Sequence, residues 1–535
     1  MNLERVAVLG GGPGGLYAAR LIKRSHPNAE VTVYEQSPPD QTFGFGVGLA
    51  SRTQRNLREA DPASLEAIVA AAHAHEMSMQ VGDQSARLAH GDLLAIARTT
   101  LLAVLQQQAQ NAGVQIHFGE RREAAELDAD LIIAADGINS ATRTQMSDAF
   151  GPRIDTGAGL YLWCGTDFAL PRAIFIPVTT EHGTFVAHAY PYAADRSTFL
   201  IETDEETWRR AGFDVSTDRT APTDSDEFAL EYLQNAFAET LQHHRLIGNR
   251  TRWTHFRTIS CEHWHSGNIV LLGDATHTAH YSIGSGTKLA MEDAIVLDRA
   301  LTTASTIEEA LTEYERVRRP AVEYLQEIAH RSELWWESFP QRMNLPLEQL
   351  MIAYMTRAGK VSVSRFHDSA PDLVRKGLAG YANVPADSVP TTAIADWILA
   401  QPLDHDHGRF EQRVATADLR EADTTSILDI DVDSAWGSEA NDIVENAPDA
   451  RVLWLTGPSS RAAVLTRLDL AERLRLDLAE RRRHRAGTLV VVEAPASYRD
   501  DIADGLASAR IDLAFFSEPA STPTDPAFSA SGASA

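Results

Sequence analysis

Short apolar runs and longer amphipathic segments alternate along the first third of the chain and predict an α/β domain. The run Val6–Leu9 is followed by six glycine and proline residues, by a helical pattern over Leu16–Ile22, and by a second run, Val31–Glu35. Apolar runs of this length between turn residues are typical of buried parallel strands. Two later runs, Leu131–Ala135 and Asn268–Leu272, predict further buried strands.

Beyond about residue 155, apolar and polar residues alternate over short runs. This alternation is typical of antiparallel strands with one buried face, so we predict an antiparallel sheet inserted into the α/β domain. The runs are Leu160–Gly165, Ala173–Val178, Thr184–Tyr190 and Ser197–Thr203. Helical patterns cover 51–75, 98–112, 286–303 and 306–338.

A segment rich in Gly, Ala, Asn and Pro near 377–395 predicts a boundary, and the chain ends in residues rich in Ser, Ala, Pro and Thr. The predicted fold class is α/β: a Rossmann-like domain with an inserted antiparallel-sheet domain, a helical extension and a small C-terminal α/β domain. The predicted segments are 1–155 for the first part of the Rossmann-like domain, 156–262 for the insert, 263–340 for the return of the first domain, 341–380 for the helical extension, 381–515 for the C-terminal domain and 516–535 for a disordered tail.

Net charge and cysteine content restrict the partners, metals and cellular compartment that we expect for this chain. The net charge is −26, which disfavours nucleic acid and anionic membranes as partners. The two cysteines show no metal-ligand spacing, so we expect no metal and no disulfide framework, and a reducing cytoplasm fits. No apolar run reaches 18 residues. We expect a cytoplasmic monomer or homodimer.

The first candidate site is a glycine-rich turn between strand and helix. Gly10, Gly12 and Gly15 match G-x-G-x-x-G, which permits a tight turn, close approach of a pyrophosphate and close helix packing. The following helix N-terminus favours phosphate. Glu35 ends the second strand, where a carboxylate accepts hydrogen bonds from ribose hydroxyls. We predict a dinucleotide site, and the acid favours FAD or NAD over NADP.

Two further turns of glycine and aspartate follow buried strands. The first lies in Ala134–Arg143, and the second, Gly273–His277, continues to two glycines and to Glu292–Ala294. With the N-terminal motif, these patterns resemble the FAD-dependent aromatic hydroxylases of the 4-hydroxybenzoate hydroxylase type (group A). The resemblance covers residues 1 to about 340, because order and spacing agree. It implies that 1–155 and 263–340 bind FAD and that 156–262 holds the substrate.

The resemblance also implies cofactor-binding residues. Arg98 begins its helix where family members place an arginine on the FAD pyrophosphate; a solvated helix-start arginine is the alternative. The loop 42–50 corresponds to a segment beside the flavin, although its composition also fits a flexible surface loop. The implied cofactor-binding set is Gly10, Gly12, Pro13, Gly14, Gly15, Glu35, Gln36, Phe45, Val47, Arg98, Asp136, Gly137, Gly273, Asp274, Gly284, Gly286 and Thr287.

The stretch His280–Ala290 departs from the common family pattern, because His280 replaces a frequent proline and Lys288 a frequent asparagine. It is similar to a branch that contains salicyloyl-CoA and anthraniloyl-CoA 5-hydroxylases and, more distantly, a tryptophan hydroxylase of violacein synthesis. The segment 42–47 and residues 355–362 resemble the same branch. The resemblance therefore implies an aromatic acyl-CoA substrate.

Candidate catalytic and substrate-binding residues follow from this branch. His280 could bind the ring substituent or act as a base near pH 7, or it could be satisfied by backbone. Lys288 could neutralise reduced flavin or reach a CoA phosphate, or it could be a solvated helix lysine. Phe45, Trp163, His188 and Tyr190 could line the ring pocket, although aromatic residues on sheets usually form core.

The function implied is monooxygenation of an aromatic ring, with salicyloyl-CoA hydroxylated at ring position 5 as the leading candidate. FAD, reduced by NADH or NADPH that binds transiently, would react with O2 to form a flavin C4a-hydroperoxide. The alternatives are a free aromatic acid, an indole or tryptophan-type substrate, and anthraniloyl-CoA. A non-catalytic FAD-binding protein and an NAD-dependent dehydrogenase are the rivals from other classes.

The C-terminal segment 381–515 is too short for a barrel of about 250 residues. Anthraniloyl-CoA enzymes of the branch carry an old-yellow-enzyme-like barrel after the hydroxylase. We interpret the segment as a truncated, non-catalytic remnant of such a barrel, with a small thioredoxin-like domain as the alternative. We expect no second flavin, which favours hydroxylation without ring reduction.

Overall fold

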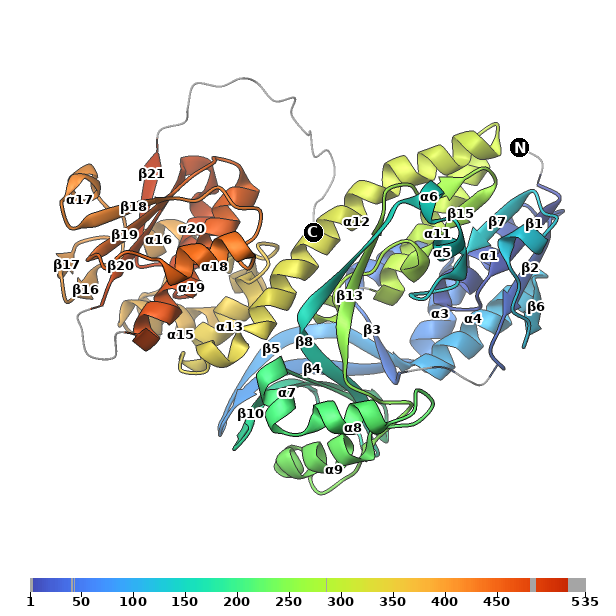
Figure 1. Cartoon of the computed structure of the whole chain (residues 1–535), viewed down its shortest axis with the longest axis horizontal. Helices are drawn as coiled ribbons and strands as arrows, with labels where there is room; N and C mark the ends of the chain where they lie inside the picture. Colours follow the sequence, from blue (N-terminus) through green and yellow to red (C-terminus); the bar gives the residue numbers. More distant parts are fainter. Residues whose placement is uncertain (1–2, 40–41, 43, 285, 482–486, 518–535) are drawn as a thin grey trace. The chain divides into compact units, whose positions relative to one another are not determined.

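The computed structural model describes residues 3–39, 42, 44–284, 286–481 and 487–517 (Figure 1). The chain divides into two compact units, Met1–Met343 and Asn344–Ala535. Residues 344–380, predicted as a separate helical extension, therefore belong to the same unit as the C-terminal domain. In the predicted tail, residues 516 and 517 end a strand, and 518–535 lie outside the described residues, as do Phe43 and Ser285.

The first unit contains the predicted parallel sheet. Its apolar runs are buried on both faces, which is why they pair in parallel between helices. Every pairing is parallel except that of the short edge strand. The strand order is β14 (His265–Ser266), β15 (Ile269–Leu271), β7 (Leu131–Ala134), β1 (Arg5–Leu9), β2 (Glu30–Glu35) and β6 (Gln115–Phe118).

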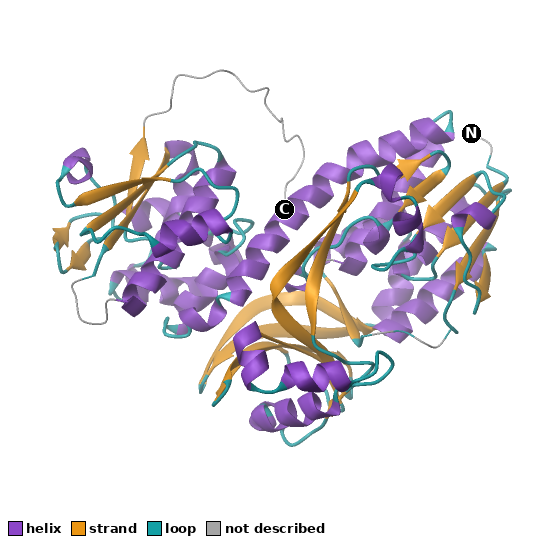
Figure 2. Cartoon of the chain, viewed as in Figure 1, coloured by secondary structure: helices purple, strands orange, loops and turns teal. Residues whose placement is uncertain are grey.

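The second sheet contains the four predicted alternating strands and more. Its order is β12 (Leu246–Ile247), β8 (Pro152–Thr166), β11 (Arg196–Thr203), β10 (Gly183–Ala193), β9 (Ala173–Thr180), β4 (His73–Val81), β5 (Gln84–Ala97) and β3 (Gly46–Leu49), with β13 (Thr254–Cys261) on β8. The strands β3, β4 and β5 precede the predicted insert and were not predicted. The second sheet therefore combines strands from residues 46–97 with strands from residues 152–261, and Figure 2 shows the strands of both sheets in orange.

Helices of the first unit cover both sheets. One core joins α1 and α11 to the parallel sheet, and a second core packs α8 and α9 on the inserted sheet. The helices are α1 (Pro13–Ser25), α2 (Ser51–Ala60), α3 (Pro62–Ala71), α4 (Arg98–Ala112), α5 (Ala141–Gln145), α6 (Ser147–Phe150), α7 (Glu205–Arg210), α8 (Phe213–Arg219), α9 (Glu227–Ala236), α10 (Ala238–Leu241), α11 (Gly286–Thr303) and α12 (Ile307–Glu337). The predicted α/β class is confirmed.

The second unit is built on four parallel strands that are neighbours in chain order: β18 (Thr425–Asp429), β19 (Val452–Thr456), β20 (Leu489–Pro495) and β21 (Leu513–Ser517). Its helices are α13 (Leu347–Thr356), α14 (Val363–Ser369), α15 (Pro371–Ala382), α16 (Ile394–Leu399), α17 (Ala417–Glu421), α18 (Ser438–Glu445), α19 (Arg461–Arg481) and α20 (Arg499–Ala507). Consecutive parallel strands are the order of a (β/α)8 barrel, of which four are half.

One face of this smaller sheet is covered by a short hairpin and a short helix of the same unit. Trp454 is fully buried there in a cluster with Leu403 and Phe410 of the hairpin β16 (Leu403–His405) and β17 (Gly408–Phe410) and with Leu419 of α17. The interpretation as a barrel remnant stays a prediction, now with this strand order to support it. Among the described residues, no helix is both long and apolar enough to cross a membrane.

Candidate active site

The glycine-rich turn joins three strands of the parallel sheet. Gly10 has φ +102°, and a Cβ there would lie 2.3 Å from the carbonyl oxygen of Ala135 at the end of β7. A Cβ on Gly15 would lie 2.2 Å from the carbonyl oxygen of Gly10. A Cβ on Gly12 would meet nothing within 4 Å, so open space remains where a pyrophosphate is expected.

The turn leads into α1, whose first residue is Pro13, a position where its fixed φ suits a helix. Gly14 packs against Ala290 of α11. Glu35 at the end of β2 is fixed by two backbone donors: Gly11 N lies 2.7 Å from Oε2, and Ser37 N lies 2.7 Å from Oε1. Its remaining lone pairs are free to accept ribose hydroxyls. The next residue, Gln36, is exposed.

Asp136 supplies a buried oxygen that no protein group satisfies. Its Oδ2 accepts hydrogen bonds from the N and Oγ1 of Thr142, at 3.1 and 3.2 Å, while Oδ1 is buried without a partner among the described residues. Gly137 follows with φ +78°. A buried polar atom without a partner is costly, so Oδ1 fits a ligand hydroxyl or amide. The predicted dinucleotide would satisfy it.

The turn Gly273–Asp274 is fixed by a buried ionic network. Asp293 of α11 accepts a hydrogen bond from Gly273 N at 3.1 Å and lies 2.8 Å from His277 Nε2 and 2.5 Å from Arg318 Nε. Although burial opposes it, His277 and Arg318 lower the pKa of Asp293. Burial raises the pKa of Asp274. The network orients the turn that would hold the ribityl chain.

Sequence reasoning assigned no role to Asp293 or Arg318. Asp293 lies in the Glu292–Ala294 motif. A carboxylate inside an apolar helix stripe indicates a buried acid that is paired with another charged or polar group. Arg318 lies in α12 and gave no local signal, because its partner is distant in the chain.

The loop before β3 connects the two sheets. Arg98, the first residue of α4, donates its backbone N–H to the carbonyl of Phe45 at 2.7 Å, and its Nε is buried without a partner among the described residues. The Phe45 ring lies against Gly165 of β8. Val47 in β3 pairs with Ile96. These contacts hold Phe45 and Arg98 beside the second sheet.

The N-terminus of α11 leaves room for a flat group. Gly284 has φ +59°, and a Cβ on it or on Gly286 would meet nothing within 4 Å. Thr287 and Lys288 lie half-buried in the first turn of the helix. A helix N-terminus stabilises negative charge, which suits a reduced flavin. The role of Lys288 stays a prediction.

Together these groups fit FAD. The unsatisfied oxygen of Asp136, the unsatisfied Nε of Arg98, the fixed carboxylate of Glu35 and the open space at three glycines all lie along the carboxyl edge of the parallel sheet or beside it. Ligands of open α/β sheets bind at that edge.

The pairing of the second sheet brings the predicted substrate residues onto one face. Trp163 and His188 are both opposite Leu200, and Tyr190 is opposite Thr198. Alternate residues of the same strands point the other way into the core under α8 and α9. The Trp163 Nε1–H is buried without a partner among the described residues, so it offers a donor to a ligand.

Two of these residues have definite partners. Tyr190 donates its hydroxyl to the carbonyl of Gly46 at 2.7 Å, so it fixes the start of β3. The His188 ring lies 4.3 Å from Trp336 of α12, between ring centres. Tyr281, which sequence reasoning missed, lies 4.9 Å from Tyr161 and 6.4 Å from Trp163, again between ring centres. An aromatic cluster thus lies on the face of the second sheet that carries Trp163 and His188.

His280 is buried and hydrogen-bonded. It is 5% exposed, its Nδ1 lies 2.9 Å from Ser282 Oγ, and its Nε2 lies 3.9 Å from Glu333 Oε1. Burial lowers the pKa of His280 to about 4, which favours the neutral ring near pH 7. The role of His280 as a base stays a prediction.

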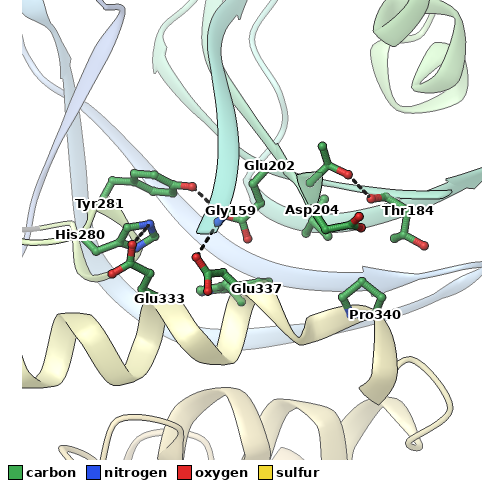
Figure 3. A pocket seen from close by; sticks show the side chains of 12 residues that line it. Gly159, Thr184, Glu202, Asp204, His280, Tyr281, Glu333, Glu337 and Pro340 are labelled. Atoms are coloured by element: carbon green, nitrogen blue, oxygen red, sulfur yellow. Dashed lines mark hydrogen bonds and ion pairs between the residues drawn. The ribbon is translucent and has the colours of Figure 1, made fainter. Parts of the chain in front are cut away.

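A small cavity, with room for about one water molecule, adjoins the aromatic cluster. We call it the carboxylate cavity, because Glu202, Glu333 and Glu337 line it together with His280 and Tyr281 (Figure 3). Sequence reasoning missed all three carboxylates. The available signals were an acid within the apolar run 197–203 and two acids, four residues apart, beside the tryptophans of α12.

Comparison with known proteins adds independent information. A family model described as an FAD binding domain matches residues 120–329. Salicyloyl-CoA 5-hydroxylase of a Streptomyces species is 44% identical over 339 residues, 63% of this chain and 66% of that protein, so the chain spans just under two thirds of that relative.

Other relatives are matched over nearly their whole length. The 3-hydroxy-4-methyl-anthranilyl-(aryl-carrier protein) 5-monooxygenase of Streptosporangium sibiricum is 38% identical over 67% of this chain and 95% of its own. Protodeoxyviolaceinate monooxygenase of Chromobacterium violaceum is 30% identical over 66% of this chain and 94% of its own. The crystal structure of 2-methyl-3-hydroxypyridine-5-carboxylic acid oxygenase has the same fold, with a TM-score of 0.51 and 19% identity over 66% of this chain and 96% of that one.

Proposed function

Because the chain belongs to the family of FAD-dependent aromatic monooxygenases, we propose that it hydroxylates an aromatic acid held as a CoA thioester. Salicyloyl-CoA, hydroxylated at ring position 5, is the leading substrate. The observation that carries this proposal is the 44% identity to salicyloyl-CoA 5-hydroxylase. The relative from Streptosporangium sibiricum also acts, by its name, on an aryl group attached to a carrier.

In this proposal the first unit holds FAD and the ring. The glycine turn, Glu35, Asp136 and Arg98 bind the dinucleotide, and α11 lies with its N-terminus toward the flavin. Bound FAD, reduced by NADH or NADPH as is usual in the family, supplies the activation of O2. The protein must then orient the ring and exclude water. Phe45, Trp163 and the aromatic cluster perform that task.

A carrier with phosphates needs exposed cations, and the net charge of −26 makes a local cluster of cations informative. The helix α2 follows β3 directly and exposes Arg52, Arg55 and Arg58. Their spacing of three residues puts them on one side of the helix. None of them has an ion pair among the described residues. We assign this α2 arginine face to the phosphates of the CoA end of the substrate.

The test is turnover by the purified full chain with FAD, NADPH or NADH, and O2. We expect salicyloyl-CoA to give a thioester heavier by one oxygen atom, labelled when 18O2 is used, and free salicylate to give none. Anthraniloyl-CoA belongs in the same panel, because a relative is named for an anthranilyl group on a carrier, and an indole substrate tests the remaining alternative. Turnover of free salicylate at an equal kcat/KM, or of no aryl thioester, would overturn the CoA assignment.

A further inference from the structure

A turn between β12 and β13 holds the chain that leads into β3. The side-chain amide of Asn249 donates one hydrogen to the carbonyl of Thr42 at 3.0 Å and the other to the carbonyl of Gly44 at 3.2 Å. Because both partners are carbonyl oxygens, the amide nitrogen and not the amide oxygen must face them. One half-buried side chain thus binds two backbone acceptors that lie 207 and 205 residues earlier in the chain.

The turn that carries Asn249 is itself fixed by hydrogen bonds. Its backbone N–H donates to Thr251 Oγ1 at 3.0 Å, and that hydroxyl donates to the carbonyl of Trp163 on β8 at 2.8 Å. Thr251 is 3% exposed, and its own N–H donates to Ser225 Oγ at 3.1 Å. The residue after Asn249, Arg250, has φ +54°, a left-handed conformation that is unfavourable for a residue with a side chain. Strain of this kind persists where the surrounding structure imposes it, and it gathers at functional positions.

The chain that Asn249 holds carries Phe45 and packs on Arg98. The Phe45 ring fills the space beside Gly165 of β8, where a Cβ would lie 2.5 Å from the ring. The carbonyl of Phe45 accepts the backbone N–H of Arg98 at 2.7 Å, and a Cβ on Gly44 would lie 3.7 Å from Arg98 Nη1. Burial raises the pKa of Asp274 and the charge of Arg98 opposes that rise, so the guanidinium faces the turn that would hold the ribityl chain. Asn249 therefore anchors a segment that lies on an arginine of the proposed FAD site.

We propose that Asn249 is a positioning residue that holds Phe45 and the backbone before it where they exclude water from the proposed flavin site. The proposal rests on the proposed function. In productive turnover NADH, a proton, O2 and the aromatic substrate give NAD+, water and the hydroxylated ring. When water reaches the reduced site, NADH, a proton and O2 give NAD+ and H2O2, and the ring leaves unchanged. The hydrogen bonds of Asn249 thus favour the first outcome over the second.

Two substitutions remove these hydrogen bonds in different ways. Asn249→Asp keeps the shape of the side chain, but its carboxylate would face the carbonyl oxygens of Thr42 and Gly44 and repel them. Asn249→Ala removes the contact without repulsion. Gly46 stays bound to Tyr190 through its carbonyl at 2.7 Å, so the release is confined to the residues before β3.

The first measurement uses the full chain loaded with FAD, without substrate. Quenching of flavin fluorescence by iodide measures how far solvent reaches the cofactor. We expect Asn249→Asp and Asn249→Ala to raise the Stern–Volmer constant at least threefold while the dissociation constant of FAD stays within twofold. Asn446→Asp, which should equal wild type, is the matched control, because the amide of this exposed residue also donates to a backbone carbonyl, that of Asp442 at 2.8 Å.

The second measurement follows turnover of salicyloyl-CoA with NADH and O2, with hydroxylated product, consumed NADH and H2O2 each determined. We expect both Asn249 variants to form at least threefold less product per NADH than wild type, with the difference recovered as H2O2. The KM for salicyloyl-CoA should stay within twofold. A loss of stability alone would leave this ratio unchanged, because unfolded protein neither consumes NADH nor forms product.

The outcomes separate the two proposals. Iodide quenching and a product ratio like wild type in both Asn249 variants would overturn the role of Asn249 while product formation upholds the function. Loss of FAD from both variants would also overturn it, because Asn249 would then support cofactor binding rather than exclusion of water. If FAD-loaded wild type hydroxylates no aryl thioester, the proposed function fails, and iodide quenching still decides whether Asn249 shields the flavin.

Discussion

Substitution of Asp293 by asparagine tests the network that fixes the Gly273–Asp274 turn. The carboxylate is fully buried between Arg318 and His277. Breaking a buried pair by neutralising one partner costs about 3–5 kcal/mol, because the other charge stays buried. Arg318 keeps Glu292 Oε2 at 3.2 Å and the Leu289 carbonyl at 3.3 Å. We therefore expect Asp293→Asn to lower the free energy of unfolding by about 3 kcal/mol, the low end of that range.

The measurement is denaturant unfolding followed by tryptophan fluorescence of the full chain, with FAD affinity determined by titration of apoprotein. We expect Asp293→Asn to lower the unfolding midpoint of the first unit and to weaken FAD binding at least tenfold. Asp128→Asn is the matched control, because Asp128 is 89% exposed in its pair with Arg5, and such pairs contribute about 0–1 kcal/mol.

The pH dependence of the free energy of unfolding provides a second check on the role of Asp293. The pKa of Asp293 is lowered in the folded protein, so its contribution is present above the unfolded pKa of about 3.9 and is lost as pH falls through the folded value. The stability difference between wild type and Asp293→Asn should therefore shrink in acid. A difference below about 1 kcal/mol at pH 7, or one that is constant down to acid pH, would refute the reasoning.

Three further predictions concern the cofactor and substrate. Gly15→Ala, whose Cβ would lie 2.2 Å from the Gly10 carbonyl, should weaken FAD binding at least tenfold, measured by flavin absorbance after gel filtration; retained FAD would contradict the close approach. Reversing the charge of the α2 arginine face should raise KM for salicyloyl-CoA at least tenfold with kcat within twofold, and an unchanged KM would place the phosphates elsewhere. Tyr190→Phe removes the hydrogen bond to Gly46 and should destabilise the start of β3 by about 1–3 kcal/mol, seen as faster proteolysis there; an unchanged cleavage rate would contradict this role of Tyr190.

Local spacing was enough to predict the dinucleotide turn. The glycines at 10, 12 and 15 and the acid Glu35 lie within one strand–helix–strand unit, so their geometry follows from sequence. Strand alternation also brought Trp163 and His188 to one face, because a period of two fixes the side of a sheet. The comparisons confirm the FAD-dependent monooxygenase class.

Long-range partners could not be predicted in this way. Asp293 with Arg318, and Glu202 with Tyr281, meet only when separate elements pack. The hairpin β4–β5 was missed for a different reason: its register shifts between His75 and Met77, which breaks the alternation that identifies a strand. The pKa of His280 depends on burial by Phe256 and Tyr281, which its own sequence neighbourhood does not reveal.

The contact between Gly10 and the Ala135 carbonyl bears on how this scaffold can be engineered. The two residues are far apart in the chain, yet the backbone of one occupies the space that a side chain on the other would need. Chimeras with a relative should therefore inherit both strand ends from a single parent. A crossover placed between them would combine loops that were never selected for one another, and cofactor occupancy would be the property that reports the mismatch.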